Sequence, residues 1–157
     1  MTFCAVLAAI YAVLTVASLP ISYGPIQFRP SEALCVLPYF APWTSWGLLV
    51  GCSVANLFSN AGTMGLDIIM GSTATFVAGF FTSRIRNKYL APLPPVVVNA
   101  LTVGAMLALV SGDLSWGRFA ICGAQVATGE LCVMYLLGLP VLILIERTGI
   151  DRTLRAL

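Results

Sequence analysis

Long apolar runs separated by short polar connectors dominate the chain. The first run, Phe3 to Leu19, is uninterrupted until Pro20 and is about long enough to cross the hydrocarbon core of a bilayer. A polar stretch follows, in which Gln27, Arg29 and Glu32 lie close together. Because turn-forming or charged residues separate the later apolar runs as well, the pattern predicts membrane helices joined by short loops.

Caps, prolines and turn residues set the predicted helix boundaries. Ser31 is a candidate cap for the second helix, Asp67 is placed to open the fourth, and Pro140 should bend the sixth. Trp43 and Trp46 indicate a membrane interface ahead of the third helix. The predicted helices run over Phe3 to Leu19, Ser31 to the region of Pro38 and Pro42, Gly47 to Phe58, Asp67 to Phe81, Pro92 to Val110, and Arg118 to Glu146.

The composition agrees with a membrane interior. Hydrophobic residues make up 59% of the 157 residues and charged residues only 9%, so the bilayer is the expected solvent. We therefore predict an all-α membrane protein with six transmembrane helices, a single integral domain over residues 1–157, and an N-terminal run that is a retained helix rather than a cleaved signal. The five cysteines show no CxxC spacing and are expected to be small buried hydrophobes.

The basic residues predict the orientation. If both termini face the cytoplasm, six basic side chains lie inside and only Arg29 and Arg118 lie outside. The stretch around Glu32, the loop from Asn60 to Gly65 and the loop around Asp113 then share the outer face. The six inside residues are Arg84, Arg86, Lys88, Arg147, Arg152 and Arg155.

Catalysis lacks its usual residues in this sequence. The chain contains no histidine, which removes the commonest general base and the commonest metal ligand. It also lacks HExxH, GxSxG and GxxxxGK[ST]. We therefore expect a protein that is not an enzyme, with no catalytic residues, no cofactor, no metal site and no nucleic-acid partner.

Glu130 is the polar residue that most needs an explanation. Counted from Arg118 it lies about 18 Å along the sixth helix, near the bilayer midplane, where a carboxylate costs about 3 kcal/mol to insert. One interpretation is a structural tie to Asn99 or Gln125 across a helix seam. The other is contact with a ligand or a role in a proton relay.

Further candidates for ligand contact carry ordinary alternatives of their own. The acids could face water at helix N-termini, the amides could bond across helix seams, and Arg29 could brace its loop through Glu32. Aromatic residues of the outer face, Tyr23 and Trp116 among them, could be interface anchors instead of a stacking surface. The candidate substrate-binding residues are Glu130, Asn99, Glu32, Asp67, Asn56, Arg29, Gln27, Phe28 and Phe119.

Small residues recur along the first helix. They form a smooth ridge that lets another helix approach closely, either inside the same bundle or in a separate membrane subunit. The ridge consists of Ala5, Ala8, Ala9 and Ala12.

Several segments, in order along nearly the whole chain, resemble the QueT family of membrane proteins. They are Gly24–Pro38, Gly51–Asn56, Asp67–Thr75, Pro95–Ala100 and Gly129–Glu130. The resemblance implies the six-helix bundle of an S component, the substrate-binding subunit of energy-coupling factor (ECF) transporters, in the bacterial cell membrane. It implies a transmembrane coupling (T) protein and two cytoplasmic ATPases as partners. It also implies a queuosine precursor as the substrate, which is a 7-deazaguanine such as queuine or its aminomethyl precursor.

The ligand implied by the resemblance suits the candidate residues. A guanine-like edge offers an N–H and an amino group to a carboxylate, and its oxo group accepts from an amide or from arginine. We expect two of Glu32, Asp67 and Glu130 to contact ligand. The alternatives are an S component or a solitary facilitator for another nucleobase or vitamin, and a membrane scaffold that transports nothing.

Overall fold

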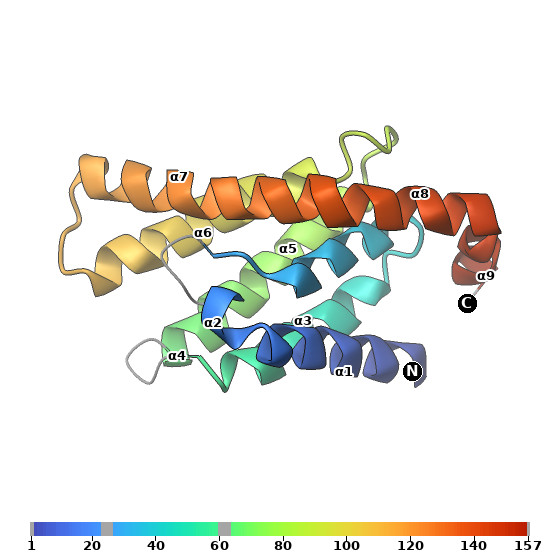
Figure 1. The fold of residues 1–157 in the computed structure, drawn as a ribbon, viewed down its shortest axis with the longest axis horizontal. Coiled ribbons are helices and arrows are strands. Elements are labelled where there is room, and N and C mark those ends of the chain that lie inside the picture. Colours follow the sequence, from blue (N-terminus) through green and yellow to red (C-terminus); the bar gives the residue numbers. More distant parts are fainter. Residues whose placement is uncertain (1, 23–26, 60–63, 157) are drawn as a thin grey trace.

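The computed structural model describes residues 2–22, 27–59 and 64–156, and these parts of the chain contain helices and connectors without a strand. The fold class is therefore all-helical, as predicted. Figure 1 shows the helices side by side along the long axis of the molecule. The elements are α1 (Thr2–Ala17), α2 (Leu19–Ser22), η1 (Pro30–Tyr39), α3 (Thr44–Asn56), α4 (Met64–Leu66), η2 (Asp67–Gly71), α5 (Ser72–Thr82), α6 (Leu93–Val110), α7 (Trp116–Val133), η3 (Met134–Gly138), α8 (Leu139–Thr148) and α9 (Ile150–Ala156).

Two helices in the described residues are long and apolar enough to cross a membrane. They are α6 and the continuous helix Trp116–Thr148, which joins α7, η3 and α8. Thr2–Ala17 and Asp67–Thr82 are shorter apolar helices. The length and composition of these elements fit a membrane bundle.

Most predicted helix starts lie within one to three residues of the observed ones, and α3 begins at Thr44 instead of Gly47. Ser31 does not cap the second helix, because η1 begins at Pro30 and the Ser31 hydroxyl lies 2.6 Å from that of Thr15 in α1. Asp67 begins the helix Asp67–Thr82 as predicted, although the short α4 precedes it directly. The last long helix starts at Trp116 rather than Arg118, since Ser115 accepts a hydrogen bond from the Arg118 backbone N–H.

The irregularity expected at Pro140 lies one turn earlier. Residues Met134–Gly138 form a π-helical turn, and Pro140 then occupies the first turn of α8. A proline cannot donate the usual helical hydrogen bond, and a widened turn before it removes the need for one. Figure 1 shows α7 and α8 continuing in nearly the same direction.

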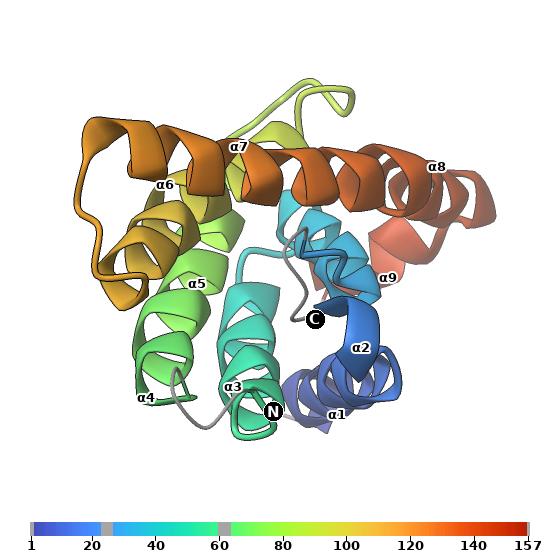
Figure 2. The ribbon, with the colours of Figure 1, turned by 60° about the vertical axis from the view of Figure 1, so that its left-hand side comes forward.

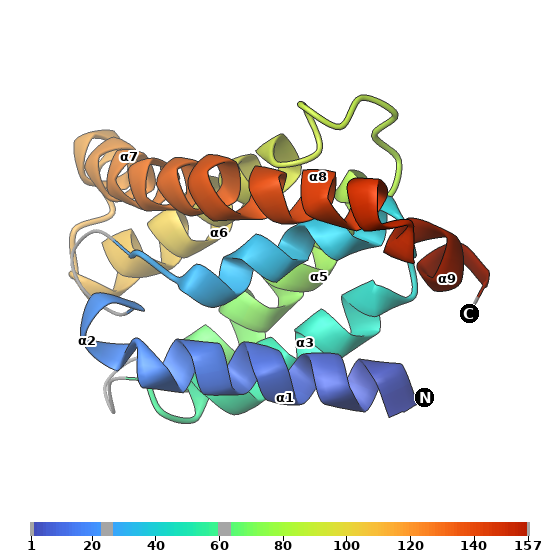
Figure 3. The ribbon, with the colours of Figure 1, turned by 45° about the vertical axis from the view of Figure 1, so that its right-hand side comes forward.

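The 3-10 helix η1 lies at the centre of the bundle. It contacts α1, α3, α5, α7, η3 and α8, and Cys35 and Val36 in it are fully buried. Figures 2 and 3 show this light-blue segment between the α7–α8 helix and the pair formed by α1 and α3. The polar stretch of the sequence therefore leads into the most enclosed element of the molecule.

Glycines let two pairs of helices approach closely. In the α1–α3 pair, a Cβ on Gly51 would lie 2.8 Å from the Ala8 carbonyl oxygen. In the α6–α7 pair, a Cβ on Gly104 would lie 2.8 Å from the Gly123 Cα. These pairs of small residues are the close contacts expected between membrane helices.

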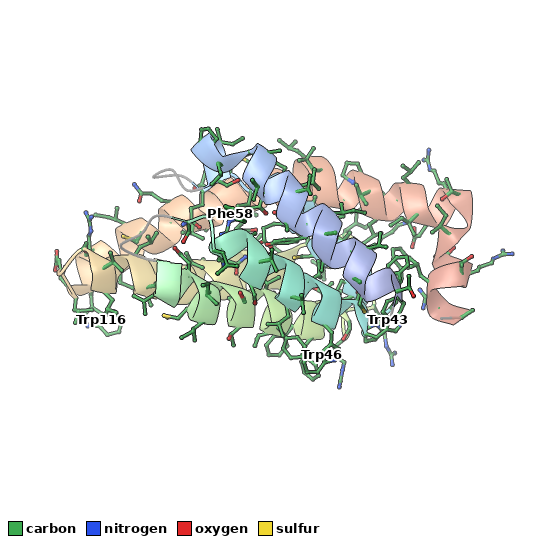
Figure 4. The ribbon with its side chains drawn as sticks, turned by 90° about the horizontal axis from the view of Figure 1, so that it is seen from below. Trp43, Trp46, Phe58 and Trp116 are labelled. Atoms are coloured by element: carbon green, nitrogen blue, oxygen red, sulfur yellow. The ribbon has the colours of Figure 1, made fainter. Side chains whose placement is uncertain are left out.

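Basic residues gather at one end of the molecule. Figure 1 places both termini and the connector between α5 and α6 toward that end, and the connector between α6 and α7 at the other. Lys88 of the α5–α6 connector donates to Glu146 of α8 at 2.8 Å, and this bond raises the pKa of Lys88 above its ordinary value. Figure 4 shows Trp116 at one end and Trp43 and Trp46 toward the other, as in the aromatic belts of membrane proteins.

Candidate functional site

Glu32 lies at the middle of the bundle with donors at both carboxylate oxygens. The Tyr11 hydroxyl of α1 donates to Oε1, and the Cys35 thiol donates to Oε2 at 2.9 Å. Arg29 Nη1 lies 3.9 Å from Oε1. Only 1% of Glu32 is exposed, so its charge is balanced by neighbouring side chains rather than by water.

Arg29 and Asn56 link this carboxylate to two further helices. Arg29 Nη2 donates to Asn56 Oδ1 at the end of α3, and Asn56 Nδ2 donates to the Asp67 backbone oxygen at 2.7 Å. Asn56 thus links the polar stretch to the π-helical turn η2. The side chains of Arg29, Asn56 and Asp67 are all buried. π-Helical turns frequently mark functional sites.

Glu130 and Asn99 form a second buried pair. Asn99 Nδ2 of α6 donates to Glu130 Oε1 of α7 at 2.8 Å. Among the described residues the other oxygen, Oε2, is buried and has no hydrogen-bond partner. Of the two structural ties that the sequence suggests, the one to Asn99 is present, and it uses half of the carboxylate.

The Glu32 network and the Glu130–Asn99 pair are close enough to interact electrostatically. Glu130 lies close enough to Glu32 for their negative charges to repel, and close enough to Arg29 to be attracted by its positive charge. The centre therefore brings together side chains from η1, α3, α6 and α7, with Arg29 preceding η1. We call these five residues, Arg29, Glu32, Asn56, Asn99 and Glu130, the polar centre.

Two surface pockets are separate from the polar centre. The larger, about 720 Å³, lies between α1 and α3 beside Phe3, Trp43 and Trp46, and is mainly apolar. The other is lined by Trp116 and Phe119 near the α6–α7 connector. Members of the polar centre do not line either pocket.

The remaining predicted binding residues are dispersed. Gln27 is buried and Phe28 is half-buried just before Arg29, where the Phe28 backbone N–H donates to the Ile21 oxygen at 3.0 Å. Asp67 is buried rather than bathed in solvent. Phe119 lies near the start of α7, about 16 Å along the helix from Glu130, and packs edge-on against Trp116.

Residues 23–26 and 60–63, which include Tyr23 and most of the Asn60–Gly65 loop, lie outside the described residues.

The alanine ridge of α1 divides between two faces. Ala8 and Ala12 are buried, and Ala8 packs against Gly51 of the same chain. Ala5 and Ala9 are exposed. The close approach that the ridge predicts therefore occurs within the bundle at Ala8, and the docking role stays a prediction.

Three polar residues at the centre were not singled out from the sequence. They are Tyr11 and Thr15 of α1, which bond Glu32 and Ser31, and Cys35, which bonds Glu32. Tyr11 and Thr15 lie four residues apart within an apolar run, which puts both on one helix face. That spacing was the available signal, whereas a cysteine in an apolar run gives none.

The described residues hold no cluster of three or more histidine, cysteine, aspartate or glutamate side chains that could bind a metal ion. What the polar centre offers is a buried set of hydrogen-bonding and charged groups. Charged groups inside a bundle of apolar helices are typical of membrane proteins that handle polar solutes. The fold and the centre thus fit a helical membrane protein of the transport class.

The chain belongs to the QueT transporter family, whose model matches residues 1–147. This confirms the resemblance seen in the sequence, and membership indicates a transporter rather than an enzyme.

Curated relatives agree on transport. The chain is similar to "Queuosine precursor transporter QueT" of Lactococcus lactis, at 37% identity over 75 residues, which is 46% of this chain and 43% of that protein. It is also 26% identical over 151 residues to proteins named "Putative bacilysin exporter BacE" in Bacillus amyloliquefaciens and Bacillus subtilis, covering 77% of this chain and 38% of each exporter. The matches thus span less than half the length of these relatives, and no solved structure matches the chain at a significant level.

Proposed function

We propose that the chain is the S component of an ECF-type importer in the bacterial cell membrane. It would capture a queuosine precursor or related 7-deazaguanine outside and deliver it to the cytoplasm, together with a T protein and two ATPases. Family membership and the name of the Lactococcus relative support the substrate. The chain has no GxxxxGK[ST] phosphate loop, so ATP-driven transport would need energy from a partner.

The observation that carries this proposal is the polar centre. Burying carboxylates, an arginine and two amides among apolar helices costs free energy, and a purely structural bundle does not need such groups. The 7-deazaguanine ring offers adjacent N–H donors and an oxo acceptor, which match a carboxylate and an amide or guanidinium donor. Phe28, half-buried and next to Arg29 in the chain, would stack on the planar ring.

Six transmembrane crossings with both termini inside are part of the same proposal. The gathering of basic residues at the end that also holds the termini supports this orientation. The exposed Ala5 and Ala9 on α1 would contact the T protein, because small residues permit close helix approach. The outer loops would close over ligand, and the subunit would then turn against its partner.

Ligand binding tests the proposal. Purified protein in detergent is titrated with queuine and with its aminomethyl precursor, and calorimetry and thermal unfolding are followed. A ligand present at 100 times its Kd should stabilise the fold by about 2.7 kcal/mol. Adenine and thiamine serve as controls, and a protein that responds to no 7-deazaguanine contradicts the proposed substrate.

A solitary transporter is the second candidate, favoured by the similarity to the exporters over most of this chain. Transport assays in proteoliposomes distinguish a solitary transporter from an S component. A facilitator or exporter moves substrate without any ATPase, whereas an S component binds ligand but accumulates it only when the T protein and ATPases are co-reconstituted.

A further inference from the structure

The two buried glutamates of the polar centre differ in how completely they are hydrogen-bonded. Both oxygens of Glu32 accept from the protein, one from Tyr11 and one from Cys35. Within the described parts of the chain, Glu130 accepts at Oε1, from Asn99. Among the described residues its Oε2 is buried, with Glu130 only 5% exposed, and it has no partner.

A purely structural tie between α6 and α7 does not explain a carboxylate at this position. A glutamine would offer the same single acceptor oxygen to Asn99 without placing a charge in an apolar interior. Leaving a buried acceptor unpaired costs about 1–3 kcal/mol, and native structures seldom leave one without a reason. A free oxygen on a buried acid is therefore best explained by a donor that arrives with a ligand.

Electrostatics narrow the choice of ligand group. Glu130 Oε2 is an acceptor in a centre that already holds a second carboxylate, Glu32, and the Arg29 guanidinium is shared between Glu32 and Asn56. A group that bonds Oε2 should thus be a strong donor, such as paired N–H groups or a cation. An oxo or phosphate group would add a further acceptor and be repelled.

We propose, on the basis of the proposed function, that Glu130 is the specificity-determining residue that accepts from the N–H and amino edge of the 7-deazaguanine. Asn99 positions Glu130 by holding Oε1. Glu32 has a structural role in the centre: it holds η1 against α1 through its bond with Tyr11 and does not bind the ligand. Of the acids considered for contact with the guanine edge, this proposal assigns Glu130.

The same geometry explains why Glu32 is a less favourable acceptor for the ligand than Glu130. A ligand donor could reach Glu32 only by displacing the Tyr11 hydroxyl or the Cys35 thiol. Either displacement would leave a buried protein donor unpaired, at a cost similar to the bond gained. Glu130 gains a bond without losing one.

A ligand-deletion cycle tests the assignment. Two ligands are compared by calorimetry in detergent: 7-aminomethyl-7-deazaguanine and the analogue that lacks the 2-amino group. Wild-type protein should bind the analogue about 10 to 100 times more weakly, because a hydrogen bond to a charged acceptor is lost. In Glu130→Gln this ratio should fall to about 3 or less, because an uncharged amide replaces the carboxylate that accepts at Oε2.

Glu32→Gln is the matched control. It removes a buried charge from the same centre and can weaken both ligands, but the ratio between them should stay at the wild-type value. If that variant does not fold, Tyr11→Phe and Cys35→Ala perturb the surroundings of Glu32 without removing its charge, and the ratio should again be preserved.

The outcomes separate this inference from the proposed function. If wild-type protein binds 7-deazaguanines and Glu130→Gln keeps the full discrimination, the assignment of Glu130 is overturned while the function stands. The assignment of Glu130 is also overturned if discrimination between the two ligands is lost in Glu32→Gln but not in Glu130→Gln. If wild-type protein binds neither ligand, the proposed function fails and the assignment fails with it.

Discussion

The buried polar side chains at the centre of this bundle are held by partners from other elements. Tyr11 reaches from α1 to Glu32 in η1, and Asn99 reaches from α6 to Glu130 in α7. In an apolar surrounding such bonds align helices because lipid and apolar side chains offer polar atoms no hydrogen bonds. The residues that make the centre polar therefore also fix how the helices sit.

Replacing Asn99 should loosen the α6–α7 pair. Asn99→Ala removes the donor to Glu130 Oε1 and should lower the free energy of unfolding by about 0.6 to 2 kcal/mol, the range for bonds between membrane helices. Thermal unfolding in detergent measures it. Thr128→Ala is the control, because the Thr128 hydroxyl is exposed and donates within α7, to the Ala124 oxygen. Equal stability of Asn99→Ala and wild type would contradict this role.

Tyr11 should matter more than its place in an apolar run suggests. Tyr11→Phe keeps the ring and deletes the donor to Glu32, so we expect a loss of about 1–3 kcal/mol in unfolding free energy. Tyr135→Phe is the comparison, because it deletes an exposed bond to the Tyr89 oxygen. Thermal unfolding in detergent compares the two variants. A larger loss for Tyr135→Phe than for Tyr11→Phe would count against a stabilising donor at Glu32.

At the scale of elements, the bundle is assembled from closely packed pairs and two π-helical turns. The α1–α3 and α6–α7 pairs meet at glycines, while η2 and η3 interrupt the helices that flank η1. A π-helical turn frees backbone groups, and at η2 the Asp67 oxygen accepts from Asn56. Helix pairs thus give rigidity, and the irregular turns surround the polar centre.

Adding one methyl group at the seams should destabilise the bundle. Gly51→Ala and Gly104→Ala each force backbone atoms apart at 2.8 Å and should lower the unfolding free energy by about 1–3 kcal/mol. Gly117→Ala is the control: its nearest neighbour would be Ser115 Oγ at 4.0 Å, and alanine favours the helix by about 0.5–1 kcal/mol. Denaturation in detergent compares the three. Stable Gly51→Ala and Gly104→Ala proteins would show that these helices can separate without cost.

At the scale of the whole molecule, charge divides the two ends. The connector with Arg84, Arg86 and Lys88 lies toward the same end as the termini, and the connector with Asp113 lies at the other. Membrane proteins keep basic connectors in the cytoplasm, so the end with the termini is the expected inner end.

Reporter fusions test this orientation. A fluorescent protein at the C-terminus should fold and fluoresce, because that end is expected inside. Alkaline phosphatase inserted after Asp113 should be active outside, and the same insertion after Asn87 should be inactive. Reversed activities would place the Asp113 connector in the cytoplasm and remove the proposed direction of capture.

The sequence alone determined the class of the protein. Apolar runs of membrane length predicted a helical bundle, and most helix positions follow because burial in lipid requires each segment to satisfy its own backbone. The family was also readable from local motifs around Glu32, Asn56 and Glu130. Helix starts at Ser31, Gly47 and Arg118 were displaced by one to three residues, because capping competes with contacts from distant elements, such as Ser31 with Thr15.

Only the tertiary structure decided which polar side chains meet. Glu32 and Tyr11 lie 21 residues apart and Asn99 and Glu130 lie 31 apart, so no local pattern could pair them. Nor could spacing reveal that both oxygens of Glu32 accept hydrogen bonds while one oxygen of Glu130 has no partner among the described residues, or that Phe119 lies away from both. The physical reason is that hydropathy follows from each residue and its neighbours along the chain, whereas hydrogen-bond partners depend on how helices pack side by side.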